Sequence, residues 1–375
     1  MAITKTVAPF YTKLAMVLIS AICLFYIAIL GKDILCPLLF GLLFAVLLLP
    51  FAIFIENRLH IHRSLAAGIS VLLLIFFLGT IVLAIISQMG AIGDDWPDFK
   101  RHLLSTLNEF QLWIASKFHV NMTKQNAYVN NTASQFLTEG PAMIGATLRS
   151  ISSMFIFIVL ILIDTFFLLY YRRLLIKFLV AVFREENSVA VYDIIAQVQS
   201  KISQYIQGLL LELIIVSTVC CLALWFMGID YPILLGILTG LLNLIPYIGI
   251  LISLLLSILV AFASAGAAKI ILVTVVLFAI HLLDANVLLP FIVGAKVRLN
   301  ALITIIGVIT GGAVWGMTGA FLAIPVIAIF KIVFDRIDGL QPWGMLLGDE
   351  RDEKEPSTLK SEISKDQDLK HVAKR

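Results

Sequence analysis

The stretch GLLNLIPYIG, residues 240–249, decides how this chain is interpreted. It lies inside an apolar run from about residue 232 to residue 263, roughly 30 residues long, whereas about 20 residues suffice to cross a bilayer. Proline removes a backbone N–H and collides with the preceding turn, so Pro246 predicts a break in the helix beside Asn243. A break at membrane depth persists only where it is buried in protein or lines a watery cavity. Because transporters often place their solute and ion sites at such breaks, the stretch predicts a membrane transporter.

The composition also indicates a membrane protein. The chain has 375 residues, of which 61% are hydrophobic and 14% charged, and its mean hydropathy is +1.03. Soluble proteins are nearer half apolar and a quarter charged. The net charge of +3 is small, and nothing in the sequence points to nucleic-acid binding. The cysteines lie in apolar runs without metal-ligand spacing and are interpreted as structural thiols: Cys23, Cys36, Cys220 and Cys221.

Motifs for catalysis are absent from the sequence. There is no HExxH zinc-protease motif, no GxSxG elbow, no P-loop and no dinucleotide fingerprint. We therefore expect a protein that is not an enzyme, has no metal or cofactor, and does not hydrolyse ATP within this chain.

The apolar runs predict an all-α polytopic protein with about eight transmembrane helices, two of them interrupted, and a small extramembrane helical segment. The simple runs are residues 10–30, 34–55, 65–89, 151–171, 209–227 and 270–289, the last ended by Pro290. The interrupted runs are residues 232–263 and 299–334. Similar pentapeptides in the two, at residues 236–240 and 307–311, raise the hypothesis of an internal repeat, although glycines at this spacing also serve helix packing.

Basic residues beside the runs predict the orientation. The loop with Arg58 and Arg63 and the pair Arg172-Arg173 mark the cytoplasmic side. Both termini are then cytoplasmic, in the inner membrane of a bacterial cell. Eight simple spans put Lys296 outside, whereas two hairpins in place of the long runs would put it inside; the eight-span arrangement is preferred here. The predicted divisions are residues 1–92 (three helices), 93–150 (extramembrane insertion), 151–348 (five helices, transport core 228–333) and 349–375 (disordered charged tail).

Two polar segments carry apolar residues at helical spacing. In the insertion, where Pro97 fits a helix start, these are Phe99, Leu103, Leu107, Phe110, Ile114 and Phe118. In the second segment, predicted to lie on the cytoplasmic surface before the span that begins at residue 209, they are Val191, Ile194, Val198, Ile202 and Tyr205.

Ionisable groups inside membrane runs are costly and often mark ion or proton pathways. Three carboxylates qualify, Asp164, Glu212 and Asp284. Asp284 follows His281 by three residues, so the two share one helix face, where they would share a proton or hold a cation. Asn286 lies on the same segment. The alternative is that His281 and Asp284 form a polar pair that holds helices together; Asp164 would otherwise pair with a basic group, and Glu212 would reach water.

Asn243 is the first candidate for solute binding, because its amide both donates and accepts hydrogen bonds. Pro246 frees backbone carbonyls beside it. Tyr247 is either part of that site or an aromatic ring at the membrane interface. Asn300 is expected to cap the last long helix.

These residues resemble the AI-2E family, the autoinducer-2 exporter-like bacterial membrane proteins. The resemblance covers roughly residues 34–348 and is strongest in GIDYPILLGILTGLLNLIPYIG (228–249), with DANVLLPFIVGAKVRLN (284–300) and GGAVWGMTGAFLAIPVIAIFK (311–331) in the expected order. Asn243, Pro246, Tyr247 and Gly249 match the family's NxIPYxG. His281 stands where the family usually has glutamine, and an imidazole titrates near neutrality whereas an amide does not.

The resemblance implies a homo-oligomer, with a pentamer as the expected form, and efflux of small polar solutes such as the quorum-sensing signal autoinducer-2. The leading hypothesis is a secondary exporter driven by the proton gradient or by the solute's own gradient. In it the solute contacts are Asn243, Pro246, Tyr247, Gly249 and Asn286, and the residues that serve the proton or cation are Asp284, His281, Asp164 and Glu212. A sodium/proton antiporter is the alternative, and a membrane scaffold that moves nothing is the alternative of another class. Expected partners are the solute, a proton or sodium ion, the lipid bilayer and further copies of the chain.

Overall fold

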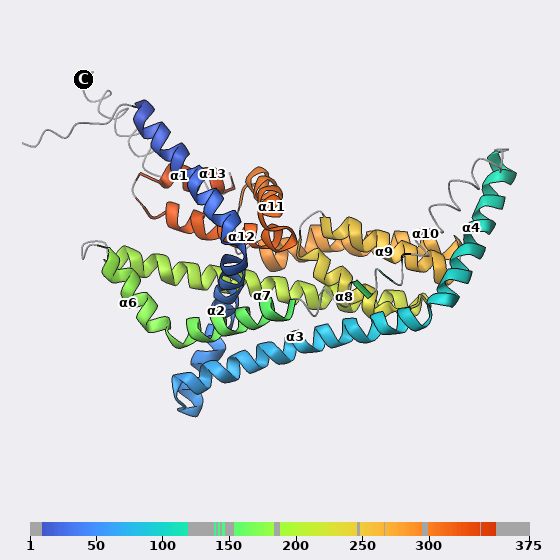
Figure 1. Ribbon diagram of the computed structural model, residues 1–375, viewed down its shortest axis with the longest axis horizontal. Helices are drawn as coiled ribbons and strands as arrows, with labels where there is room; N and C mark the ends of the chain where they lie inside the picture. Colours follow the sequence, from blue (N-terminus) through green and yellow to red (C-terminus); the bar gives the residue numbers. More distant parts are fainter. Residues whose placement is uncertain are drawn as a thin grey trace, which may run out of the picture.

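A computed structural model describes residues 10–118, 139, 142, 145–146, 154–183, 188–245, 248–265, 267–294, 299–337 and 339–349. The described chain is helical, and its only β-type pairing is an isolated bridge between Leu299 and Gly348. The helices are α1 Phe10–Leu30, α2 Lys32–Leu59, α3 Arg63–Asp94, α4 Trp96–Phe118, an unlabelled helix Met154–Tyr170, α6 Arg172–Val182, α7 Ser188–Phe226, α8 Pro232–Asn243, α9 Ile248–Ala265, α10 Ala267–Leu283, α11 Ala301–Trp315, α12 Met317–Phe334 and α13 Gln341–Leu347. Figure 1 shows their arrangement, and the predicted all-α class is confirmed.

Several helices are suited to a bilayer. Within the described residues, five are long and apolar enough to cross it, and a sixth span results if Met154–Tyr170 and α6, which meet at 71°, are counted together. Their outer faces carry large apolar side chains, such as Phe76 at 74% exposure and Phe226 at 78%. Water would disfavour so much exposed apolar surface, whereas lipid does not. The chain is therefore a multi-pass membrane protein.

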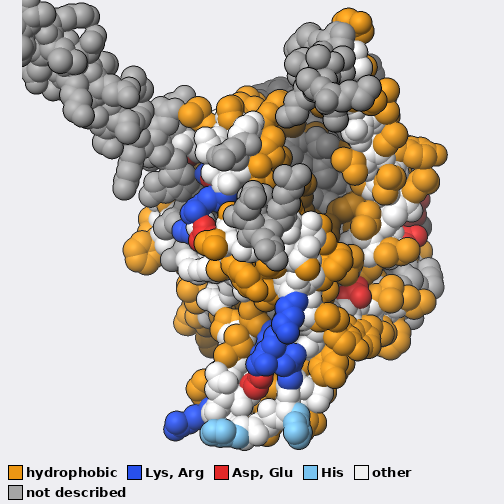
Figure 2. Space-filling view, turned by 90° about the vertical axis from the view of Figure 1, so that its left-hand side faces the viewer, with side chains coloured by type: hydrophobic (Ala, Val, Ile, Leu, Met, Phe, Trp, Pro, Cys, Tyr) orange, Lys and Arg blue, Asp and Glu red, His pale blue; other side chains and the backbone are white. Residues whose placement is uncertain are grey.

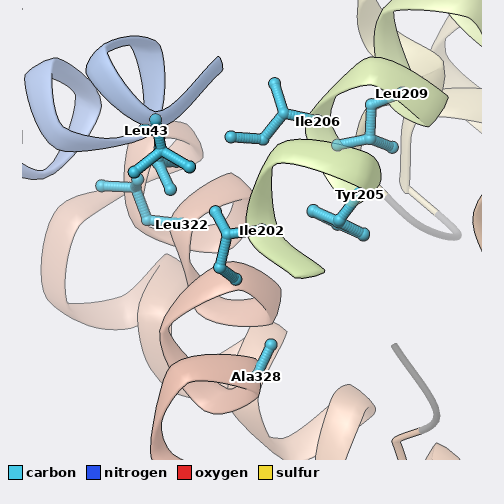
Figure 3. Packing of buried hydrophobic residues seen from close by; sticks show 8 residues of the cluster. Leu43, Ile202, Tyr205, Ile206, Leu209, Leu322 and Ala328 are labelled. Carbon is cyan, nitrogen blue, oxygen red and sulfur yellow. The ribbon is translucent and has the colours of Figure 1, made fainter. Parts of the chain in front are cut away.

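Helix α7 is the longest helix in the described part of the chain. It runs unbroken for 39 residues, roughly 58 Å at 1.5 Å per residue. The segment up to Tyr205 that was predicted to lie on the cytoplasmic surface and the span predicted to start at residue 209 are joined in this one continuous helix. Gly208, the residue between them, costs a helix interior only about 1 kcal/mol relative to alanine. Packing across this point offsets that cost, because side chains from both parts enter one core with α2 and α12 (Figure 3): Ile202, Tyr205, Ile206 and Leu209 with Leu43, Leu322 and Ala328.

Both interrupted runs fold back on themselves, α8 with α9 as hairpin A and α11 with α12 as hairpin B. In hairpin A, Thr239 and Leu254 line the same small cavity, although a straight helix would separate them by roughly 22 Å. In hairpin B, a Cβ added to Gly311 would lie 2.4 Å from the carbonyl oxygen of Gly319. The preferred arrangement, in which each run is one interrupted span, is thus replaced by the hairpin arrangement. Glycine at the contacts permits this close approach of backbones.

The two hairpins have their bases at opposite ends of α7 (Figure 1). At the base of hairpin A, which follows the C-terminal end of α7, the Tyr231 hydroxyl donates to Asp95 Oδ2 at 2.8 Å. Burial, and then the bond to Asp95, raise the pKa of the Tyr231 phenol, so the hydroxyl keeps its proton. At the base of hairpin B, Arg336 Nη1 lies 2.5 Å from Asp193 Oδ2, close to the N-terminal end of α7. The tips therefore approach each other along the middle of α7.

The similar pentapeptides contact different neighbours. Gly236 and Gly240 of α8 lie against α7, where an added Cβ on Gly240 would be 2.0 Å from Ser217 Oγ. Gly307 and Gly311 of α11 instead lie against α12. Both pairs allow close helix packing, but they do so in helix pairs that are not equivalent.

The sequence analysis predicted that the helix of residues 270–289 ends at Pro290, but helix α10 is extended past this proline. It continues as two π-helical segments, Asp284–Leu288 and Pro290–Gly294. The N–H of Leu289 donates to the carbonyl oxygen of Asp284, five residues earlier. Pro290 has no N–H to give an α-helical bond, and the wider π turn relieves the clash of its ring with the preceding turn. The widened stretch begins at Asp284, one of the candidate site residues.

Two local predictions are confirmed at helix starts. Helix α4 begins at Trp96, next to Pro97, and its apolar face packs through Leu103 toward Phe262 of α9. Asn300 caps α11, since its side chain accepts from the Leu302 N–H at 2.9 Å. The side chains of Phe110, Ile114 and Phe118, most of residues 119–150 and the tail beyond Asp349 lie outside the described residues.

Candidate functional site

A polar cluster lies where hairpin A meets the middle of α7. Asn243, the last residue of α8, donates through Nδ2 to Glu212 Oε1 at 2.9 Å and to Asp284 Oδ2 at 2.8 Å. Glu212 comes from α7 and is 2% exposed; Asp284 comes from the end of α10 and is 3% exposed. The sequence predicted each of these residues as a candidate, but it did not predict that one amide joins the two carboxylates.

The cluster has a shortage of positive charge. Glu212 Oε2 and Asp284 Oδ1 are buried without a hydrogen-bond partner among the described residues. Neither Glu212 nor Asp284 takes part in the ion pairs found among the described residues. Two neighbouring carboxylates in an apolar interior do not both remain ionised unless something compensates them. A proton or a bound cation would supply that compensation.

A small cavity adjoins the cluster. It has a volume of about 30 Å³ and is lined by Asn243, Asp284 and His281, among others. One water molecule occupies about 30 Å³ in the liquid, whereas pockets for organic ligands measure about 300–1,000 Å³. The cavity thus has room for one water molecule or a small cation, and it brings together the predicted pair His281 and Asp284. We call it the ion cavity.

A second, larger cavity separates the tips of the two hairpins. Its volume is about 420 Å³, and we call it the tip cavity. Its lining is mostly apolar: Leu242, Ile245, Gly249 and Ile252 from hairpin A, and Val308, Ile309, Gly312, Gly316, Met317 and Ala320 from hairpin B and its turn. The tip of hairpin B includes the first turn of α12, and the first N–H groups of a helix have no partner within it. In the first turn of α9, by contrast, the Gly249 N–H donates to the Ile245 carbonyl oxygen at 3.2 Å. The size and the α12 donors suit a small organic solute.

One turn of α8 serves both cavities. Leu242 lines the tip cavity, and its neighbour Asn243 lines the ion cavity. Gly249 contacts this turn directly, because a Cβ at that position would lie 1.7 Å from the Leu242 carbonyl oxygen. Gly249 was predicted as a solute contact, and the structure adds a steric reason for glycine there: hairpin A closes only if this position has no side chain.

Asn286 and Asp164 do not join the cluster. The Asn286 side chain is exposed and donates to the Leu282 carbonyl oxygen at 2.8 Å, and it lines neither cavity. Asp164 lies on the helix Met154–Tyr170 against Gly41 of α2. Pro246 and Tyr247 lie outside the described residues.

Sequence reasoning missed three polar residues that line the ion cavity, Thr239, Ser253 and Cys220. Thr239 precedes Asn243 by four residues, so the two share a helix face. Ser253 and Ser257 are likewise four apart on the otherwise apolar α9, and both are buried. This spacing of small polar residues was a usable signal.

Comparisons with known proteins point to transport. A family model described as AI-2E family transporter matches residues 15–339. The chain is 26% identical over 275 residues to "Putative transport protein YueF" of Bacillus subtilis (strain 168), covering 70% of this chain and 72% of that protein. It is 27% identical over 276 residues to "Putative permease PerM" of Escherichia coli (strain K12), covering 72% and 76%. It is 23% identical over 351 residues to "Putative transport protein MT0215" of Mycobacterium tuberculosis (strain CDC 1551 / Oshkosh), covering 90% and 94%.

Proposed function

Since the chain belongs to the AI-2E family and is a membrane transporter, we propose that it is a secondary exporter of a small solute whose movement is coupled to a proton or cation. One observation carries the proposal: a single amide, that of Asn243, is shared by two buried carboxylates. If Asn243 only held two helices together, one carboxylate partner would be enough, because burying a second carboxylate adds a desolvation cost. A site that takes up and releases a positive charge does need the second carboxylate.

The coupling site in this proposal is the cluster of Asn243, Glu212 and Asp284, with His281 as the titratable neighbour. When a proton or cation is present, the two carboxylates are compensated and the amide holds them together. When it leaves, the carboxylates repel each other. Because Asn243 ends α8, that repulsion acts on the tip of hairpin A. This assigns Asn243 to coupling rather than to solute binding.

The solute site in this proposal is the tip cavity. Its volume of about 420 Å³ falls in the range of pockets for small organic ligands. Met317 lies at the start of α12, whose first N–H groups would bind oxygen atoms of the solute. The Gly249 N–H already donates to the Ile245 carbonyl oxygen at 3.2 Å, so Gly249 contributes to the wall of the cavity and not a donor. A small oxygenated molecule of the autoinducer-2 kind fits this combination of apolar walls and backbone donors.

A sodium/proton antiporter is the second candidate, and the size of the ion cavity favours it. About 30 Å³ admits a small cation but no organic solute. In that case the carboxylates of Glu212 and Asp284 would exchange sodium for protons, and the tip cavity would carry water.

Flux measurements in proteoliposomes would test both candidates. Vesicles containing a pH-sensitive dye receive autoinducer-2 or sodium separately. Proton movement that depends on autoinducer-2 supports the exporter, proton movement that depends on sodium alone supports the antiporter, and no flux with any tested solute or ion supports the scaffold. Asp284→Asn and Glu212→Gln are each expected to abolish coupled flux.

Asp164→Asn is the matched control, since Asp164 is a carboxylate on a membrane helix outside the cluster. It is expected to keep normal flux. Unchanged coupled flux in Asp284→Asn would remove the proposed coupling role.

We also propose the orientation and assembly expected above: an inner-membrane homo-oligomer of bacterial cells with both termini in the cytoplasm. The support is the basic residues near Glu56 and the family membership. No catalytic role is proposed.

A further inference from the structure

An apolar groove lies between α2, α6 and α7, and none of its lining residues belongs to the ion cavity or the tip cavity. Its volume is about 420 Å³. The walls are aliphatic and aromatic, with Arg172 and Gln199 as the polar lining residues: Leu42, Ala45, Val46 and Leu49 of α2, Leu175, Ile176, Phe178 and Leu179 of α6, Ile194, Ile195 and Val198 of α7, with Leu168, Leu169 and Ile329. Such a groove matches a hydrocarbon chain better than a water-soluble ligand.

Helix α6 forms one wall and has the features of a helix at a membrane surface. Its sequence, RRLLIKFLVAV, begins with Arg172 and Arg173 and is otherwise apolar except for Lys177. Leu174 and Phe178 are exposed. The helix turns by 71° from the preceding span, so it does not continue along that span. A short amphipathic helix with basic residues is suited to the boundary between headgroups and acyl chains.

Positive charge is in excess where α6 begins. Arg172 forms an ion pair with Glu56, and Arg173 Nη2 lies 3.2 Å from Glu56 Oε1. Arg63 is nearby, because its Nη1 donates to the Tyr170 carbonyl oxygen at 3.5 Å. Two guanidinium groups therefore share one carboxylate, and a third lies beside the residue that precedes this turn of the chain. Figure 2 shows Lys and Arg side chains gathered around an acidic group on a largely apolar face.

Two of these guanidinium groups have donors to spare. Arg172 Nη1 and Arg63 Nε are buried and have no hydrogen-bond partner among the described residues. A buried donor left unpaired costs about 1–3 kcal/mol, more if charged. An anionic oxygen is the partner that would satisfy such donors best.

We propose that this groove binds an anionic phospholipid. One acyl chain lies along α7 beside Ile195 and Val198, and the phosphate binds Arg172 and Arg173. The apolar walls account for the chain, and the excess of arginine over glutamate at the groove accounts for the negative headgroup. A zwitterionic lipid matches the walls equally well but not the charge.

Native mass spectrometry of the full chain in detergent would measure this binding. Phosphatidylglycerol and phosphatidylcholine with identical acyl chains serve as probes. Wild-type protein is expected to retain phosphatidylglycerol preferentially. Arg172→Gln and Arg173→Gln should each weaken its binding by about five-fold, the effect of one basic residue near an anionic headgroup. Ile195→Trp, which fills the groove, should weaken both lipids.

Two further variants keep the test decisive. Arg101→Gln removes an arginine that is 79% exposed on α4, and it should change nothing. Glu56→Gln removes the carboxylate that competes for Arg172 and Arg173, so it should strengthen phosphatidylglycerol binding, a gain that a damaged fold would not produce. Equal retention of the two lipids by wild type, or weaker binding in Glu56→Gln, would overturn the proposal. So would an Ile195→Trp protein that loses its oligomeric state but keeps its lipid, since the groove would then be a contact between copies.

Discussion

Asn243 joins two carboxylates because its amide nitrogen carries two hydrogens that point in different directions. One hydrogen is directed to Glu212 and the other to Asp284. Aspartate has the same shape but no hydrogen to donate, and leucine has neither donor nor acceptor. The identity of this residue therefore matters more than its size.

At the residue scale, we predict that Gly249→Ala destabilises hairpin A by about 1–3 kcal/mol, as overpacking commonly does. The new methyl group would overlap the Leu242 carbonyl oxygen, which belongs to the backbone and has little freedom to move. Thermal unfolding of the purified protein in detergent measures the loss.

Gly79→Ala on α3 is the control, because no atom beyond the adjoining backbone of its own helix lies within 4 Å of the position where its Cβ would be placed. Alanine favours a helix by up to about 1 kcal/mol over glycine, so the control should unfold at the same temperature or higher. If both variants lose stability equally, the close contact between Gly249 and Leu242 is not what hairpin A depends on.

At the scale of elements, the π-helical end of α10 determines how Asp284 is presented. The bond from the Leu289 N–H to the Asp284 carbonyl oxygen replaces the usual four-residue spacing by five. This widened turn rotates the residues before it relative to those after it. Inserted π turns are frequent at functional sites.

We predict that Pro290→Ala preserves or raises stability but lowers coupled flux. Alanine restores the missing N–H and allows the α-helical spacing to return, which would turn Asp284 away from Asn243. Unfolding temperature and proteoliposome flux, measured on one preparation, separate the two effects. A variant that is less stable yet transports normally would show that the proline supports the fold and has no part in coupling.

The helices themselves were predictable, whereas their relations in space were not. An apolar run predicted α1, apolar residues at helical spacing predicted α4, and a cap predicted the start of α11, because those signals are local. Glu212 precedes Asn243 by 31 residues, and no local pattern shows that the two meet. The continuity of α7 was not predicted, because an amphipathic pattern up to Tyr205 gives way to an apolar run at residue 209, and a local pattern does not show that one helix carries both.

The same distinction explains the hairpins. A proline or a pair of glycines indicates that a helix is interrupted, but the direction taken after the break depends on which neighbours the next helix contacts. For hairpin B that is settled by glycine contacts between α11 and α12, such as Gly311 with Gly319. The sequence left both arrangements open for this reason.

At the scale of the whole molecule, the hairpins approach from opposite ends of α7. We predict that their bases face opposite sides of the membrane. Asp230→Cys, at the base of hairpin A, should react with an impermeant maleimide in intact cells. Ile337→Cys, at the base of hairpin B, should react only after the cells are lysed.

Wild-type protein, with its four cysteines, gives the background labelling. Labelling of both new cysteines in intact cells would show that the two bases share one side, and it would contradict the proposed orientation. It would also remove the basis for movement of the tips from opposite directions.

The adjacency of Leu242 and Asn243 has a consequence for attempts to engineer which solute is transported. The backbone holds consecutive helical positions about 100° apart. A substitution at Leu242 that reshapes the wall of the tip cavity therefore also shifts Asn243, which binds the two carboxylates at the ion cavity. Solute selectivity and ion coupling would then change together, and variants that transport a new solute should often show an altered coupling ion as well.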